Sequence, residues 1–173
     1  MGTSAQIRSL GAKLAFGLIA TLFTSGAQAA TQTTSSRAVT LRPLSIVKIS
    51  DLEFGTMIAG ATGGTVVINP TTDARTTTGG TTAAGGAPKA AQFLTYGTQN
   101  SVLQVNRGPL PVLNRAGGGA SMNVTQLTLN GPVTRVVDPA GVLDLRVGGT
   151  LAVAANQLSG SYSGTFDIIV TYF

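Results

Sequence analysis

The sequence predicts an all-β sandwich, and three observations support this prediction. Short stretches of alternating apolar and polar residues recur along the chain, and a period of two is typical of strands with one face in a core. Turn residues, above all glycine and proline, separate these stretches at steady intervals. After residue 29, no long stretch has helical apolar spacing, and the poor helix formers glycine and threonine are frequent. We expect about eight short strands.

The first 29 residues have the features of a secretory signal peptide. Arg8 and Lys13 precede a short apolar stretch at residues 14–23, and Ala27-Gln28-Ala29 matches a small-residue cleavage site. We therefore expect export through the inner membrane to the periplasm, and then to the cell surface or the extracellular space. No membrane span is expected after cleavage, and an uncleaved anchor is the less favoured alternative.

The rest of the chain is expected to form one domain. Residues 30–37 are polar and are predicted to be a flexible N-terminus, and residues 38–173 are predicted to be a single β-sandwich. The chain has no cysteine, so burial and strand pairing must hold this domain together without disulfides.

The first strand signal begins directly after the polar N-terminus. Val39 and Leu41 alternate with polar residues, and Leu44 and Ile46 continue the pattern after Pro43. Proline has no backbone N–H to donate to a neighbouring strand. The sequence therefore predicts an edge strand here, or two short strands with a break between them.

The next segments alternate between strand and turn signals. Residues 63–70 are rich in β-branched side chains and bounded by glycine and proline, which predicts a strand. Residues 71–87 are a low-complexity run of threonine, glycine and alanine, interpreted as a long surface loop or hairpin outside the core. Two more strands are predicted at residues 90–96 and 102–105, with turn residues at 97–101 between them.

The second half of the chain contains further strand signals. In one of them, the alternation slips between Val124 and Leu127, which indicates a β-bulge. In another, Leu143, Leu145 and Val147 share one face, and Gly148 is expected to interrupt the strand. The predicted strands are residues 110–113, 122–130 and 142–153.

The clearest strand signal lies at residues 160–173. Apolar residues, with one glycine among them, occupy every second position: Tyr162, Gly164, Phe166, Ile168, Val170 and Tyr172. Full burial of one such side chain stabilises a fold by about 1.5–3 kcal/mol. Five of them contribute roughly 7–15 kcal/mol as an upper bound, which is comparable with the stability of a whole domain. We therefore expect this strand to be indispensable for folding.

Composition argues against an enzyme and against nucleic-acid binding. Without histidine or cysteine, the chain has no imidazole base, no thiolate and no conventional zinc site. The basic residues are scattered singly, whereas nucleic-acid binding requires a clustered basic patch. We expect no catalytic residue, metal or cofactor. Asp51 and Glu53 would share one face of an extended segment, but both lie at a turn, and we interpret them as solvated turn acids and not as a catalytic pair. The other acids are too few and too spread out to suggest a calcium site: Asp73, Asp138, Asp144 and Asp167.

Seven short motifs are spread over nearly the whole chain after residue 29. They are Leu52-Glu-Phe-Gly55, Gly64-Thr-Val-Val-Ile68, Ala91-Gln-Phe93, Met122-Asn-Val124, Val147-Gly-Gly-Thr-Leu151, the 160–166 run Gly-Ser-Tyr-Ser-Gly-Thr-Phe, and Val170-Thr-Tyr172. Together they resemble a family of secreted bacterial proteins, the domain of unknown function 4402. That family is in turn similar to the pilin-type subunits of archaic chaperone–usher fimbriae. The resemblance implies an immunoglobulin-like, pilin-type antiparallel β-sandwich and a surface-fibre subunit of a Gram-negative bacterium.

A pilin-type sandwich lacks one strand, and this has consequences for pairing. A periplasmic chaperone fills the gap first, and the N-terminal extension of a neighbouring subunit replaces it. The resemblance thus makes the strand from Tyr162 to Tyr172 the segment that pairs with a chaperone or subunit. Residues 30–36 contain no apolar alternation, so the candidate donor residues are Val39, Leu41, Leu44 and Ile46. They also form the candidate first strand, so a self-complete sandwich remains an alternative.

The functional hypothesis is an exported, non-enzymatic subunit of a surface fibre or fimbria-like assembly. It would pair strand to strand with like subunits or with fimbrial partner subunits. A periplasmic chaperone and an outer-membrane usher would assist its assembly, and the fibre would contribute to adhesion or biofilm. The alternative is a monomeric secreted binding module whose segment 71–87 contacts a glycan or another surface ligand. A secreted hydrolase is disfavoured because histidine and cysteine are absent.

Overall fold

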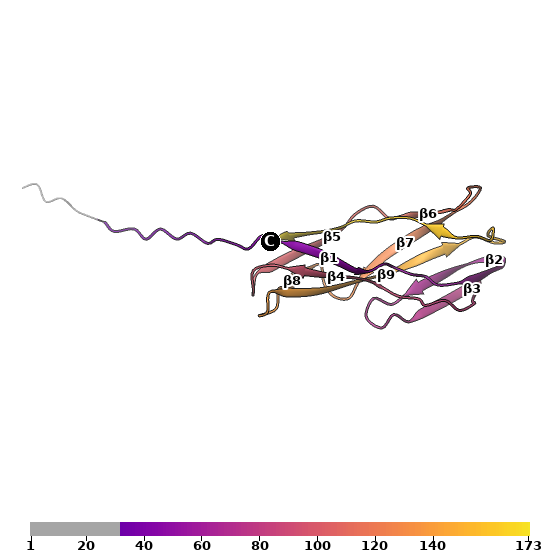
Figure 1. Ribbon diagram of the computed structural model, residues 1–173, viewed down its shortest axis with the longest axis horizontal. Coiled ribbons are helices and arrows are strands. Elements are labelled where there is room, and N and C mark those ends of the chain that lie inside the picture. Colours follow the sequence, from indigo (N-terminus) through magenta and orange to yellow (C-terminus); the bar gives the residue numbers. More distant parts are fainter. Residues whose placement is uncertain (1–31) are drawn as a thin grey trace, which may run out of the picture. The chain divides into compact units, whose positions relative to one another are not determined.

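The computed structural model describes residues 32–173, and the expected signal peptide at residues 1–29 lies outside the described residues. The chain from Val39 to Phe173 forms one compact unit, whereas residues 32–38 are exposed and have no regular structure. Within residues 32–173 there are eleven strands and no helix (Figure 1). This part of the chain accordingly has no helix that could cross a membrane.

The strands vary in length from two to twelve residues. They are β1 (Ser45–Ser50), β2 (Met57–Ile68), β3 (Arg75–Ala83), β4 (Ala91–Tyr96), β5 (Val102–Arg107), β6 (Val112–Arg115), β7 (Ser121–Leu129), β8 (Thr134–Val136), β9 (Val142–Val153), β10 (Tyr162–Ser163) and β11 (Ile168–Tyr172).

The strands form two antiparallel sheets. The larger sheet has the order β1-β4-β9-β7-β6-β10, and the hairpin of β2 and β3 joins it through pairing of β2 with β9. The smaller sheet has the order β11-β5-β8. The all-β prediction is confirmed for the described residues, and the two sheets are consistent with a β-sandwich.

Strand β9 lies at the centre of the larger sheet and of the core. Its residues Leu145, Val147, Leu151 and Val153 are buried. The expected interruption at Gly148 is wrong, because β9 continues through it. A Cβ atom at Gly148 would lie 2.1 Å from the carbonyl oxygen of Ile68, so the glycine permits a close approach of β2. At this point the neighbour of β9 changes from β4 to β2.

The threonine-rich segment is part of the sheet. Of the two expectations for residues 71–87, the hairpin is confirmed and the loop is wrong, because β3 pairs with β2 over most of its length. Its placement outside the core is also wrong in part, because Thr81 is buried. The β2 strand begins at Met57, earlier than the predicted residue 63.

The predicted bulge is confirmed in β7. Pairing between β7 and β9 shifts register between Val124 and Gln126, which is where the apolar alternation slips.

The C-terminal strand confirms one part of its prediction and differs from it in two others. Its alternation is confirmed, because the apolar residues from Tyr162 to Tyr172 are half-buried and their neighbours are exposed. However, it is two strands, because β10 pairs with β6 and β11 pairs with β5 in the other sheet. Near the break, Gly164 lies so close to β6 that a Cβ atom would be 2.5 Å from the Val112 carbonyl oxygen. Since none of the five side chains is fully buried, the estimate of 7–15 kcal/mol is too high.

These burial differences predict unequal mutational effects. We expect Leu145→Ala to lower the free energy of unfolding by about 2–5 kcal/mol, because Leu145 is fully buried beside β4 and β7. The control Ile49→Ala, at a β1 side chain that is 52% exposed, should change it by less than about 1 kcal/mol. Urea denaturation followed by circular dichroism measures both, and equal losses would contradict the assignment of the core.

Candidate subunit-pairing edge

Five strands in the described part of the chain have a neighbour on one edge only: β1, β3, β8, β10 and β11. Such edges expose unpaired N–H and C=O groups, and proteins protect them with short strands or charges. Strands β8 and β10 have three and two residues, and β1 carries Lys48. Strand β3 is polar, with the sequence RTTTGGTTA. Of these five described strands, only β11, with the sequence IIVTY, combines an open edge with an uncharged, mostly apolar composition.

The hydrogen-bonding pattern shows which residues of β11 face its open edge. Asp167 and Phe173, which flank the strand, both hydrogen-bond to the β5 chain through their backbones, at 2.9 and 3.0 Å. Because this pairing alternates along antiparallel strands, Ile169 and Thr171 also point to β5. The backbone groups of the other three residues therefore point to the open edge: Ile168, Val170 and Tyr172.

The same three residues carry the half-buried side chains of β11. Ile168 and Val170 pack against the core cluster without being fully covered. A strand added at this edge would therefore pair with their backbone groups and also cover the flank of their side chains. Strand addition needs free backbone groups and apolar side chains to cover, and the open edge of β11 offers both.

The inner face of β1 is incompletely covered as well. Ile46 lies opposite Thr95 of β4, which is fully buried, so both side chains are on the core face of the sheet. Ile46 nevertheless remains 43% exposed. The hydroxyl of Thr95 is buried and has no hydrogen-bond partner among the described residues. The smaller sheet thus leaves part of the core face near β1 uncovered.

Tyr172 joins the end of β11 to the chain that leads into β1. Its hydroxyl donates to the carbonyl oxygen of Arg42 at 2.6 Å and accepts from the backbone N–H of Thr98 at 2.8 Å. The N–H of Arg42 donates in turn to the Thr98 hydroxyl at 2.7 Å. The first and last strands therefore meet at one end of the domain (Figure 1).

The four candidate donor residues fall into two pairs. Ile46 lies within β1 of the chain's own sheet, and Leu44 is half-buried directly before that strand. Val39 and Leu41 precede any strand and are 84% and 48% exposed. The structure thus separates a first strand from an exposed segment upstream of it.

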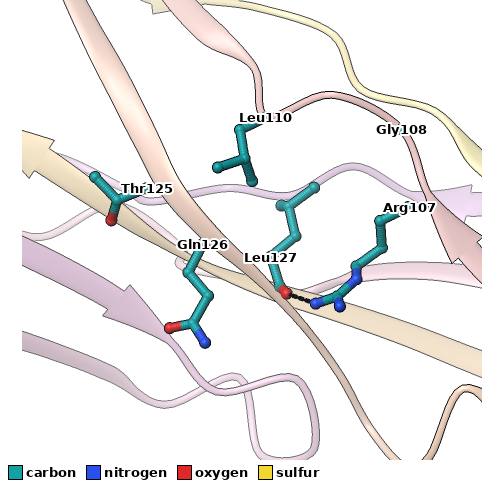
Figure 2. Close-up of a pocket in the computed structure, with 6 residues that line it drawn as sticks. All are labelled: Arg107, Gly108, Leu110, Thr125, Gln126 and Leu127. Atoms are coloured by element: carbon teal, nitrogen blue, oxygen red, sulfur yellow. Dashed lines mark hydrogen bonds between the residues drawn. The ribbon is translucent and has the colours of Figure 1, made fainter.

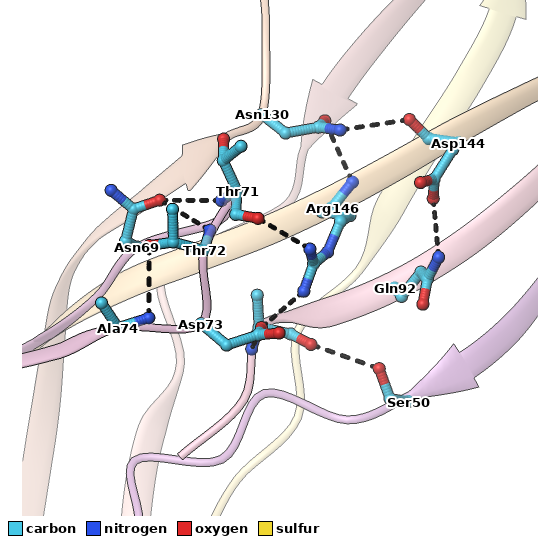
Figure 3. A network of polar contacts seen from close by, with 11 residues as sticks. Ser50, Asn69, Thr71, Thr72, Asp73, Ala74, Gln92, Asn130, Asp144 and Arg146 are labelled. Atoms are coloured by element: carbon cyan, nitrogen blue, oxygen red, sulfur yellow. Dashed lines mark hydrogen bonds and ion pairs between the residues drawn. The ribbon is translucent and has the colours of Figure 1, made fainter.

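One ion pair connects the β2–β3 turn to β9 (Figure 3). A carboxylate oxygen of Asp73 accepts from the backbone N–H of Ala90 at 2.7 Å and from the Arg146 guanidinium at 2.5 Å. Arg146 also donates to the carbonyl oxygen of Thr71 at 2.9 Å. The Asp73 side chain therefore fastens the hairpin turn to the sheet.

The other acids do not assemble into a site. Asp51 pairs with the exposed Lys48 at 2.7 Å, and Asp138 accepts from the backbone N–H of Val142 at 2.7 Å. Within residues 32–173, no three acidic side chains are grouped so that they could hold a metal ion.

A hollow of about 380 Å³ lies beside β7 (Figure 2). The pairing of β6 with β7 ends at Asn123, so the next part of β7 has no strand on that side. There the Arg107 guanidinium, which comes from β5, donates to the carbonyl oxygen of Leu127. Arg107 thus binds a β7 carbonyl group that has no strand partner on this side. The residues that line the hollow include no carboxylate that could act as a general acid or base. Its lining is Arg107, Gly108, Leu110, Thr125, Gln126 and Leu127.

Comparison with protein families gives a match over most of the described chain. The family described as Domain of unknown function (DUF4402) matches residues 44–172. The chain belongs to this family. The matched region includes all strands from β1 to β11, and it begins after Val39 and Leu41. Comparisons with curated proteins and with solved structures gave no significant match.

The Asp73 contacts predict an acid-sensitive contribution to stability. The backbone hydrogen bond from Ala90, together with Arg146, holds the pKa of Asp73 below its ordinary value. A lowered pKa in the folded state stabilises the fold above the unfolded pKa of about 3.9, and this contribution is lost as the pH falls through the folded value. We expect Asp73→Asn to be less stable than wild type at neutral pH, with a difference that shrinks below about pH 4. Denaturant melts over a pH series measure it, and a constant difference would contradict this role.

Proposed function

We propose that this protein is a non-enzymatic structural subunit of a surface fibre, in which the N-terminal segment of a second copy pairs with the open edge of β11. The single observation that supports this most is the combination on β11 of free backbone groups and half-covered apolar side chains. The other edges are short, charged, polar or, in β7, occupied by Arg107.

The strand order supports the pilin-type immunoglobulin-like interpretation of the sandwich. An immunoglobulin-like sandwich has strands A, B, E and D in one sheet and C, F and G in the other. The order β1-β4-β9-β7 corresponds to A-B-E-D, and β5-β11 corresponds to C-F. The position of strand G, beside β11, is not filled by any strand of the described residues. A donated strand would take that position.

Val39 and Leu41 are the best-suited residues of the donated segment. They are two positions apart, so their side chains point to the same face of an extended strand. Both are exposed in the subunit itself and lie before the region that matches the family. Burial of the two side chains on a neighbouring copy would contribute about 3–6 kcal/mol, in addition to backbone hydrogen bonds.

An uncharged open edge is an aggregation hazard before assembly. We therefore propose that a periplasmic chaperone covers the β11 edge after export, that an outer-membrane usher receives the subunit, and that the fibre acts at the cell surface in adhesion or biofilm. The chaperone would use the same edge that later receives the neighbouring subunit.

The test is a denaturing gel of the assembled protein, run with and without boiling. Strand-exchanged copies should give a ladder that collapses to a single band on heating. Leu41→Lys should give folded monomers without a ladder, because a charged side chain cannot be buried on the neighbouring copy. Leu110→Lys is the matched control, since Leu110 is 49% exposed and lies outside the donated segment.

A single band in both lanes of the wild type would contradict the proposal and favour the monomeric binding module. A normal ladder from Leu41→Lys would exclude the donor assignment. An unfolded Leu41→Lys monomer would place Leu41 in the chain's own core.

A further inference from the structure

We infer that Asp167 fixes the direction and the register of the donated strand by forming an ion pair with Arg42 of a second copy. This inference rests on the proposed function, in which the segment before Pro43 pairs with the β11 edge of a neighbouring copy. The ion pair determines which residues of the two chains lie opposite each other.

Asp167 lies directly before β11 and carries an exposed carboxylate. Its backbone carbonyl oxygen accepts from the N–H of Gly108 at 2.9 Å, so its backbone points to the β5 chain. Its side chain is exposed, whereas the next one, of Ile168, is half-buried on the core face, so the carboxylate is on the outer face of the smaller sheet. Among the described residues, Asp167 has no ion-pair partner.

Arg42 is the charged residue that follows the donated residues Val39 and Leu41. Its backbone is bound within its own subunit, because the carbonyl oxygen accepts from the Tyr172 hydroxyl at 2.6 Å and the N–H donates to the Thr98 hydroxyl at 2.7 Å. The residue is exposed, and its guanidinium forms no ion pair within residues 32–173. A cation is therefore present at the point where a donated strand would join its own domain.

Val39 and Leu41 can cover the half-buried row of β11 in four ways. The two side chains can lie beside Ile168 and Val170, or beside Val170 and Tyr172. In each case the donated strand can run antiparallel or parallel to β11. The apolar residues alone do not distinguish these four arrangements.

The charges distinguish them. Only the antiparallel arrangement with Leu41 opposite Ile168 places Arg42 directly opposite Asp167. Both side chains are then on the outer face, where an ion pair remains hydrated and needs no burial of charge. In the other three arrangements Arg42 lies opposite an uncharged residue: Ile169, Thr171 or Phe173.

The backbone pattern agrees with this register. Because Asp167 points its backbone to β5, the residue opposite it points its own backbone groups away from β11. Arg42 can therefore keep its hydrogen bonds to Tyr172 and Thr98 of its own subunit. In such a non-hydrogen-bonded pair the Cα atoms are about 4.5 Å apart, which brings the two charged side chains within reach of each other.

Pro43 disfavours the antiparallel register that is shifted by two residues. There Leu41 would lie opposite Val170 and Pro43 opposite Ile168, whose backbone groups point to the open edge. Proline has no N–H to donate to the Ile168 carbonyl oxygen, so this register loses a hydrogen bond. With Leu41 opposite Ile168, Pro43 lies beyond the first residue of β11 and no pairing is lost.

The first experiment exchanges the two charges and measures assembly on the gel without boiling. Asp167→Arg or Arg42→Asp places like charges opposite each other and should lower the fraction of protein in the ladder by about two- to fivefold. Both changes together restore opposite charges and should restore the ladder. The matched control combines Asp167→Arg with Arg37→Asp, which gives the same net charge and should not restore the ladder.

The second experiment tests the register with disulfides, which is possible because the chain has no cysteine. Ala38→Cys and Thr171→Cys are introduced into two full-length proteins with different tags, which then assemble together. These positions lie opposite each other in this register alone of the four, so oxidation should give a covalent dimer with one chain of each kind. The control pair, Thr40→Cys and Thr171→Cys, is two residues out of register and should give little of that dimer.

Equal amounts of covalent dimer from the two cysteine pairs would overturn the inference. Restoration of the ladder by Arg37→Asp as complete as that by Arg42→Asp would overturn it too. If Asp167→Arg does not fold, Asp167→Asn and Arg42→Gln replace the reversals. Their combined loss should then be no larger than either single loss, and additive losses would reject the pair.

The two proposals fail differently. A wild type without a ladder rejects the fibre subunit. A wild-type ladder with cross-links out of register rejects only the role of Asp167.

Discussion

The pairing of β11 with a neighbour on only one edge is the constraint on which the rest of this structure depends. The larger sheet is complete around β9, which has strands on both sides and a buried apolar face. The smaller sheet ends at β11, so its apolar row is half-covered and the inner face of β1 remains accessible at Ile46. In the proposed fibre, the open edge of β11 is the position that a strand of a second copy fills.

The polar contacts of the domain are consistent with this arrangement. Arg107 donates to the backbone carbonyl oxygen of Leu127 in β7, and Asp73 connects the β2–β3 turn to Arg146 in β9. Both side chains therefore act within the subunit. Tyr172 likewise acts within the subunit, because its hydroxyl joins the end of β11 to Arg42, shortly before β1. The residues that support the fold are therefore separate from those that we assign to assembly.

The sequence predicted features that depend on neighbouring residues along the chain. The all-β class, the bulge after Val124 and the alternation of the last strand are local patterns, and the structure confirms them. Features that depend on distant residues were missed. The break near Gly164 depends on the approach of Val112, and the contact of Tyr172 with Arg42 joins positions 130 residues apart. Sequence alternation likewise indicates which face is apolar but not how completely another sheet covers it.

The most direct test of the open edge is amide hydrogen exchange, resolved by residue, in the monomer and in the assembled protein. Ile169 and Thr171 point to β5, so their amides should be protected in both states. Ile168 and Val170 point to the open edge, so their amides should exchange rapidly in the monomer and become protected on assembly. Protection of Val170 equal to that of Thr171 in the monomer would contradict the open edge. Rapid exchange of Val170 in the assembled protein would contradict its use in subunit pairing.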